Sequence, residues 1–136
     1  MPSIPVGIRY EICRRVTDEI AVDFLGLEGA RVLGTPFLIM LLEMASRNAI
    51  LPLLDAGYDS VGTEVNVRHL AATPMGMEVT FRSEVIHVDD RRVRFKVEAF
   101  DEKEQVADGT HERFVIHVER FAKRLAEKSP SWRALK

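Results

Sequence analysis

The sequence has one cysteine, almost no net charge and no long apolar run, and each shortage argues against a class of protein. Cys13 cannot form an internal disulfide, which fits a reducing cytoplasm. A formal net charge of -2 gives no indication of a nucleic-acid partner. Residues 1–15 lack the apolar segment of a signal peptide, and the longest apolar run is far shorter than a bilayer span. We therefore expect a cytoplasmic globular protein that binds neither nucleic acid nor membrane.

Motifs typical of cofactor and metal chemistry are also missing. The chain contains no glycine-rich nucleotide-binding loop and no G-x-S-x-G motif. Cys13 has no metal-ligand spacing, and neither do His87, His111 and His117 on their predicted strands. The sequence therefore predicts no metal site.

What the chain does contain is a strongly apolar stretch over residues 32–54, VLGTPFLIMLLEMASRNAILPLL. Gly34 allows a sharp turn, the Thr35 hydroxyl is typical of a helix cap, and Pro36 suits the first helical position. The pattern predicts a helix from Pro36 to about Leu54, with Pro52 kinking or ending its last turn. From Phe37 to Ala45 this helix is apolar on every side except at Glu43, so the rest of the protein must cover it.

Strands are predicted on both sides of this helix. Residues 8–17 indicate a first strand, and four later segments alternate apolar and polar side chains, as strands with one buried face do: 61–69, 79–85, 92–99 and 113–118. In the first of these, Val61, Val65, Val67 and His69 share one face. Residues 119–128 predict a short amphipathic helix at the end of the chain.

These elements predict an α+β fold in one domain over residues 1–136, with a curved antiparallel sheet wrapping the central helix. One sheet cannot easily cover a helix that is apolar on every side. We therefore expect a second copy to complete the burial, in a homodimer or a larger assembly.

Three polar residues lie where an apolar residue would be ordinary: Thr35, Glu43 and His69. Thr35 could simply cap the helix, although a helix N-terminus also suits a developing oxyanion. Glu43 could pair with Arg47, but such a pair contributes only a few tenths of a kcal/mol. His69 could be a hydrogen-bonded core histidine, or a group that takes and gives a proton near neutrality. Structural and catalytic interpretations both remain open for each residue.

The spacing of these residues constrains any shared site. Thr35 and Glu43 lie about 12 Å apart along a helix axis, at 1.5 Å per residue. Side chains this far apart cannot easily contact one reacting atom within one chain. They would either flank an extended substrate or form a site with residues from two subunits.

Three motifs together resemble the fluoroacetyl-CoA thioesterase family of the hotdog-fold thioesterases: GTPFLIMLLEMA, SVGTEVNVRHLAATP and DGTHERFVIH. The likeness runs from about Val32 to Phe121. It implies a long helix wrapped by an antiparallel sheet, dimerisation through the sheets, and thioester hydrolysis at the subunit interface. It also implies that Thr35, Glu43 and His69 are catalytic.

The same resemblance implies substrate contacts for Gly62, in the acyl pocket, and for Arg113. Both have ordinary alternatives, because Gly62 could relieve crowding in a bent strand and Arg113 falls on the charged face of its predicted strand. The resemblance is to enzymes that have a phenylalanine-rich lid before the catalytic threonine. Here the stretch AVDFLGLEGARVLG offers only Phe24, so the sequence does not indicate selection for a fluorinated acyl group.

We therefore expect an acyl-CoA thioesterase for a small or medium acyl group. His69 would act as general base and acid on water or on the Thr35 hydroxyl, and Glu43 would orient His69, hold its positive charge or assist water. No metal or organic cofactor is expected, since coenzyme A belongs to the substrate. The alternative is a hotdog-shaped module that binds an acyl-CoA or another apolar ligand without cleaving it.

Overall fold

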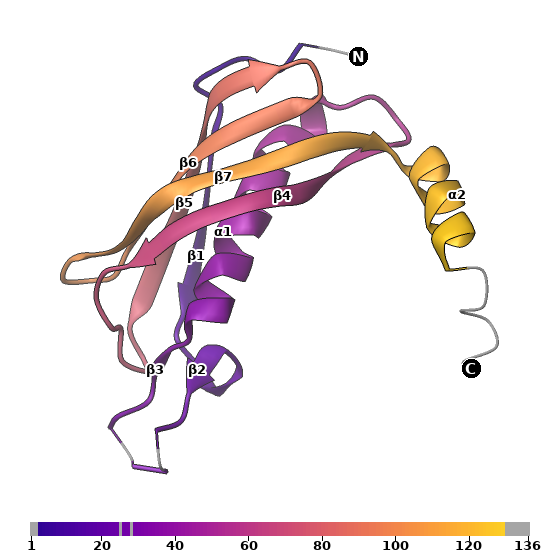
Figure 1. Cartoon of the computed structure of the whole chain (residues 1–136). Helices are drawn as coiled ribbons and strands as arrows, with labels where there is room; N and C mark the ends of the chain where they lie inside the picture. Colours follow the sequence, from indigo (N-terminus) through magenta and orange to yellow (C-terminus); the bar gives the residue numbers. More distant parts are fainter. Residues whose placement is uncertain (1–2, 25, 28, 130–136) are drawn as a thin grey trace.

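A five-stranded antiparallel sheet curves around one long helix, α1 (Figure 1). The computed structural model describes residues 3–24, 26–27 and 29–129. Its strands are β1 (Arg9–Arg15), β2 (Ala21–Val22), β3 (Val32–Leu33), β4 (Tyr58–His69), β5 (Glu78–Asp89), β6 (Arg92–Phe100) and β7 (Gln105–His117). Its helices are α1 (Thr35–Ile50), α2 (Val118–Lys128) and two 3-10 turns, η1 (Asp18–Ile20) and η2 (Leu51–Leu53). The predicted α+β class and curved antiparallel sheet are confirmed.

The strand order in the sheet is β1-β5-β6-β7-β4, which leaves β4 at one edge. β5 and β6 form a hairpin, and Asp90 in its turn adopts a positive φ of 55°. β2 and β3 form a separate two-stranded sheet at the N-terminal end of α1 (Figure 1). The Leu33 N–H donates to the Thr73 carbonyl (2.9 Å), which ties this small sheet to the loop that follows β4.

The core lies between α1 and the concave side of the sheet, where α1 packs chiefly on β5 and β1. Each fully buried aliphatic or aromatic side chain contributes about 1.5–3 kcal/mol through removal of apolar surface from water. The largest of them come from both layers and include Leu38, Leu41, Leu42, Phe81 and Phe95. The helix ends where the sequence predicted, because Pro52 lies in η2 and cannot continue an α-helical ladder.

One side of α1 remains uncovered within a single chain. Met40 and Met44 are partly exposed there, and Val65 on the edge strand β4 is also exposed. The segment Thr35–Leu53 is long and apolar enough to cross a membrane by length and composition alone, a test that core helices of soluble proteins also pass. Its buried side forms the core against the sheet, so we interpret it as a core helix.

Val65, Val67 and His69 share one face of β4 as predicted, but Val61 does not, because the strand contains a β-bulge. Gly62 pairs with Arg113 while Glu64 pairs with Glu112, so Thr63 is an extra residue without a partner in the ladder. An extra residue shifts the alternation by one position. Val61 therefore lies on the face opposite to His69, although the sequence placed them together.

The predicted faces of β7 are also wrong. Arg113 pairs with the buried Val93, and His111 pairs with the buried Phe95, so both polar side chains face α1. Arg113 is only 6% exposed and does not lie on a solvated face. Burial of a guanidinium is tolerable only where acceptors surround it, and those acceptors come from β4, α1 and β7 itself.

Candidate active site

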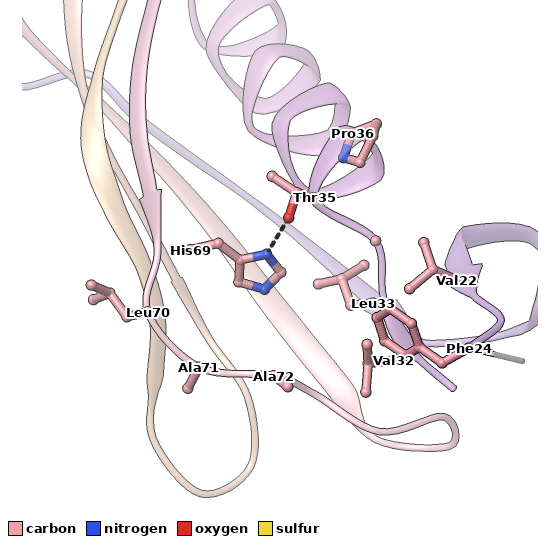
Figure 2. Close-up of a pocket in the computed structure, with 11 residues that line it drawn as sticks. Val22, Phe24, Val32, Leu33, Thr35, Pro36, His69, Leu70, Ala71 and Ala72 are labelled. Atoms are coloured by element: carbon pink, nitrogen blue, oxygen red, sulfur yellow. Dashed lines mark hydrogen bonds between the residues drawn. The ribbon is translucent and has the colours of Figure 1, made fainter. Parts of the chain in front are cut away.

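A pocket of about 580 Å³ opens at the N-terminal end of α1 (Figure 2). One wall comes from β2, β3 and the loop between them, and the other comes from the end of β4 and the loop that follows. Most of the lining is apolar: Val22, Phe24, Val32, Leu33, Leu70 and Ala71. Two polar side chains also line it, Thr35 from the first turn of α1 and His69 from the last position of β4.

Thr35 and His69 form a direct hydrogen bond, with Oγ1 lying 2.8 Å from Nδ1 (Figure 2). The prediction that Thr35 caps α1 is wrong. Gly34 occupies the N-cap position, and no side chain makes a capping hydrogen bond there. Thr35 is the first helical residue, and its hydroxyl is engaged by His69 instead.

The environment of His69 keeps its ring neutral. Burial lowers the pKa of His69 below its ordinary value, and the backbone at Ala71 offsets part of this effect. The Nε2 atom is buried and has no hydrogen-bond partner among the described residues. When Nε2 carries the proton of the neutral ring, Nδ1 accepts the hydrogen of the Thr35 hydroxyl. A neutral imidazole in contact with a hydroxyl is the arrangement that a general base needs.

Glu43 belongs to a second cluster, further along α1. Its Oε2 lies 3.4 Å from Arg113 Nη1 and 3.8 Å from His111 Nε2. Arg47, the partner considered from the sequence, instead pairs with Asp59 through two hydrogen bonds of 2.9 and 2.6 Å. Within one chain the structure therefore brings Thr35 and His69 together but does not place Glu43 beside them.

Arg113 is the centre of this second cluster. Its Nε donates to Ser60 Oγ (2.7 Å) and its Nη2 donates to the Ser60 carbonyl (2.8 Å). Burial lowers the pKa of Arg113, while the charges of Glu43 and Asp59 counteract that shift. A guanidinium stays protonated in this setting, so Arg113 is a fixed cation beside Glu43.

Gly62 completes the cluster by leaving space. A Cβ atom at this position would overlap Glu43 Oε2 and would lie 3.2 Å from the His111 ring. Sequence reasoning assigned no role to Ser60 or His111. The available signal was the same for both: His111 lies within the motif DGTHERFVIH, and Ser60 is the first residue of the motif SVGTEVNVRHLAATP.

Among residues 3–24, 26–27 and 29–129, no group of three or more His, Cys, Asp or Glu side chains is arranged to hold a metal ion. The polar side chains of the Thr35–His69 pair contact each other, and those around Arg113 contact one another and the backbone.

Similarity to known proteins extends over most of the chain. A model of the fluoroacetyl-CoA-specific thioesterase family matches residues 16–119. The fluoroacetyl-CoA thioesterase of Streptantibioticus cattleyicolor is 40% identical over 104 residues, which are 76% of this chain and 75% of that protein.

Solved structures are similar over nearly the whole chain. A structure of the fluoroacetyl-CoA thioesterase FlK has a TM-score of 0.84 and 36% identity, covering 93% of this chain and 98% of that one. A hypothetical protein of the thioesterase superfamily from Thermus thermophilus has a TM-score of 0.87 and 29% identity, covering 98% and 99%. The chain therefore has the hotdog fold and belongs to the fluoroacetyl-CoA-specific thioesterase family.

Proposed function

We propose that this protein is an acyl-CoA thioesterase that hydrolyses a small or medium acyl thioester to a carboxylate and the free thiol of coenzyme A. The hydrogen bond between Thr35 and His69 inside an apolar pocket carries the proposal. An apolar pocket accepts an acyl chain, and the paired hydroxyl and imidazole lie where its carbonyl would enter. Membership of a thioesterase family supports the same reaction.

His69 is the proposed general base. It takes a proton from the Thr35 hydroxyl or from a water molecule held by Thr35, and it returns that proton to the departing sulfur. Thr35 lies at the N-terminus of α1, where the positive end of the helix dipole stabilises negative charge on the thioester oxygen. The reaction needs no metal or organic cofactor, because coenzyme A is part of the substrate.

Glu43, Gly62 and Arg113 are proposed to complete the site from a second subunit. Within one chain Glu43 and Thr35 lie about 12 Å apart along α1, too far to act on one carbonyl. The exposed β4 edge and the uncovered side of α1 offer the surface for a homodimer, and a larger assembly is compatible with it. In such a dimer, Glu43 of one copy would support His69 of the other.

We propose that the protein accepts a broader range of acyl groups than fluoroacetyl. FlK has been solved with fluoroacetate and CoA, and in a variant with acetyl-CoA. Among the described residues that line the pocket, Phe24 is the single phenylalanine, and its side chain is largely exposed. Aliphatic side chains form the rest of the apolar wall, which suits a non-fluorinated acyl chain. We place the reaction in the cytoplasm, where acyl-CoA substrates and a reduced Cys13 are expected.

Thiol release tests the proposal directly. Acetyl-, fluoroacetyl-, butyryl-, hexanoyl- and benzoyl-CoA are incubated with the purified protein and a thiol-reactive dye. We expect release with at least one of them, and its loss in His69→Ala but not in the exposed His87→Ala. Saturable acyl-CoA binding without thiol release from any of these substrates would instead establish a non-catalytic binding module.

A further inference from the structure

His111 is a buried titratable side chain for which the proposed reaction has no role. It lies in the middle of β7, faces α1 and is 1% exposed. Its ring stacks on Phe95 with 6.0 Å between ring centroids and 27° between planes. A buried imidazole this far from solvent must have its nitrogens satisfied, and its contacts show how.

The two hydrogen bonds of His111 assign one tautomer, since Glu43 Oε2, at 3.8 Å from Nε2, lies beyond hydrogen-bond distance. Nδ1 lies 2.8 Å from the backbone carbonyl of Glu64, which can only accept a hydrogen bond, so Nδ1 carries the proton. Nε2 lies 3.2 Å from Nη1 of Arg113, which can only donate, so Nε2 is bare. A neutral ring protonated on Nδ1 satisfies both contacts, whereas a doubly protonated ring would place an N–H against the Arg113 cation.

This acceptor fixes the direction of the Arg113 guanidinium. Ser60 holds the Nε and Nη2 side of the group, and His111 Nε2 accepts from Nη1. Nη1 carries two hydrogens, and the second is left to donate to Glu43 Oε2 at 3.4 Å. Without His111, Nη1 would be held by Glu43 alone and the ion pair would lose its fixed geometry.

We propose that His111 is a positioning residue, a neutral acceptor that aims Arg113 at Glu43 and so holds the carboxylate in place for the reaction. The inference rests on the proposed function of Glu43 and Arg113 as groups of the thioesterase site. His111 acts through Arg113 and contacts no substrate.

The charged groups around His111 shift its pKa in opposing directions. Burial lowers the pKa of His111 and Arg113 lowers it further, while the Glu64 carbonyl and the charges of Glu43 and Glu112 raise it. The lowering prevails, so the ring remains the neutral acceptor at pH 7. Protonation of Nε2 at low pH removes the acceptor and places a His111 cation beside the Arg113 cation.

The first test does not depend on activity. Nitrogen-15 NMR of the labelled protein at pH 7 should show His111 protonated on Nδ1 and bare on Nε2. The Arg113 guanidinium should give a signal in slow exchange with water. A His111 ring protonated on Nε2, or a freely exchanging Arg113 signal, would overturn the proposal.

The second test uses two substitutions that each keep one half of the imidazole. His111→Gln places an amide oxygen near the Nε2 position and keeps an acceptor for Arg113. His111→Asn places an amide near the Nδ1 position and keeps only the Glu64 contact. We expect His111→Asn to lower kcat/KM about tenfold or more and to release the Arg113 signal, with His111→Gln within about threefold of wild type.

Exposed His87→Asn serves as the control for the substitution itself, and melting temperatures show that each variant is folded. A merely structural role would lower activity equally in both His111 variants, which would contradict the proposal. If the wild-type protein releases no thiol from any acyl-CoA, the proposed function fails. The tautomer of His111 and the Arg113 signal in the two variants then still decide the positioning role.

Discussion

The carboxylate of Glu43 fills the space beside Gly62 that a side chain at this position would need. Gly62 does not have the positive φ that calls for glycine elsewhere in the chain, so backbone conformation does not explain it. What it provides is room: the missing Cβ lets Glu43 reach Arg113 Nη1 at 3.4 Å. A glycine interpreted from the sequence as pocket lining thus supports the position of an acid.

Substitution of Gly62 by alanine should therefore separate Glu43 from Arg113. We expect kcat/KM for thiol release to fall by about tenfold, the scale of one lost charged hydrogen bond. Gly7→Ala provides the matched control, because Gly7 has a φ of 100° and no atom near its missing Cβ. That variant should lose stability without losing kcat/KM. Equal activity of Gly62→Ala and wild type would show that the position of Glu43 is irrelevant to turnover.

Removal of the Thr35 hydroxyl should affect catalysis and leave the helix intact. Thr35→Val keeps the branched shape but cannot donate to His69, so we expect kcat/KM to fall by about a hundredfold or more. Thr35→Ser should retain much of the activity. The hydroxyl does not cap α1, so the free energy of unfolding should change by less than about 1 kcal/mol, measured by denaturant titration. A large stability loss in Thr35→Val would contradict this assignment.

The pH dependence follows from the lowered pKa of His69. A general base works in its neutral form, so activity falls as pH drops through the folded pKa, which lies below the ordinary value of about 6.5. The acid limb of the kcat/KM profile should therefore have its midpoint below pH 6.5. A midpoint above 6.5 would contradict the lowered pKa of His69.

The stability of the folded protein should also fall as pH drops. The pKa values of His69 and His111 are both lowered on folding, so the unfolded chain binds more protons as pH falls below about 6.5. Their contribution to stability is present above the unfolded pKa and is lost as pH falls through the folded values. Melting temperature should fall across this window, and less steeply in His111→Gln. Identical slopes for the two proteins would contradict the burial of a neutral His111.

Subunit exchange distinguishes a shared site from one built within a chain. Thr35 and His69 are joined in one chain, so a mixture of Thr35→Val and His69→Ala proteins should stay inactive. A mixture of Thr35→Val and Glu43→Gln proteins should recover activity, because each mixed dimer holds one intact site. Random exchange predicts about a quarter of wild-type activity. No recovery after verified exchange would show that Glu43 acts within its own chain.

The homodimer can be tested at the edge of the sheet. Val65 on β4 and Ile86 on β5 are both 41% exposed, so they form a matched pair for substitution by lysine. A lysine on a strand edge blocks pairing with another chain, and β4 is an edge strand of the five-stranded sheet whereas β5 lies between β1 and β6. Val65→Lys should shift the protein toward monomer in analytical ultracentrifugation, while Ile86→Lys should not. Unchanged mass for Val65→Lys would place the interface elsewhere.

Much of the fold was predictable because its signals are local. The turn at Gly34 to Pro36 marks the start of α1, and Pro52 marks its end within a few residues of Ile50. Alternating side chains located the long strands, since a strand with one buried face repeats every second residue. Thr35 and His69 also stood out as polar groups among apolar neighbours.

The faces of β4 and β7 were not predictable in the same way. The bulge at Thr63 has only a weak sequence signal, because the adjacent Gly62 suggests a bent strand without showing which residue is the extra one. One extra residue reverses every later side chain of β4. Arg113 was assigned to the solvated face because the alternation of its predicted strand places it there. The partners that make its burial tolerable lie on segments far away in the chain.

The sequence by itself determined where the helices and strands form and which residue types could carry a reaction, because periodicity, turn residues and family motifs are written in consecutive positions. Only the tertiary structure decided which of those residues meet. Thr35 and His69 are 34 residues apart in the chain, and Glu43 and Arg113 are 70 apart. Such contacts depend on strand order, on the register around one bulge and on the packing of α1, and the folded chain sets these together.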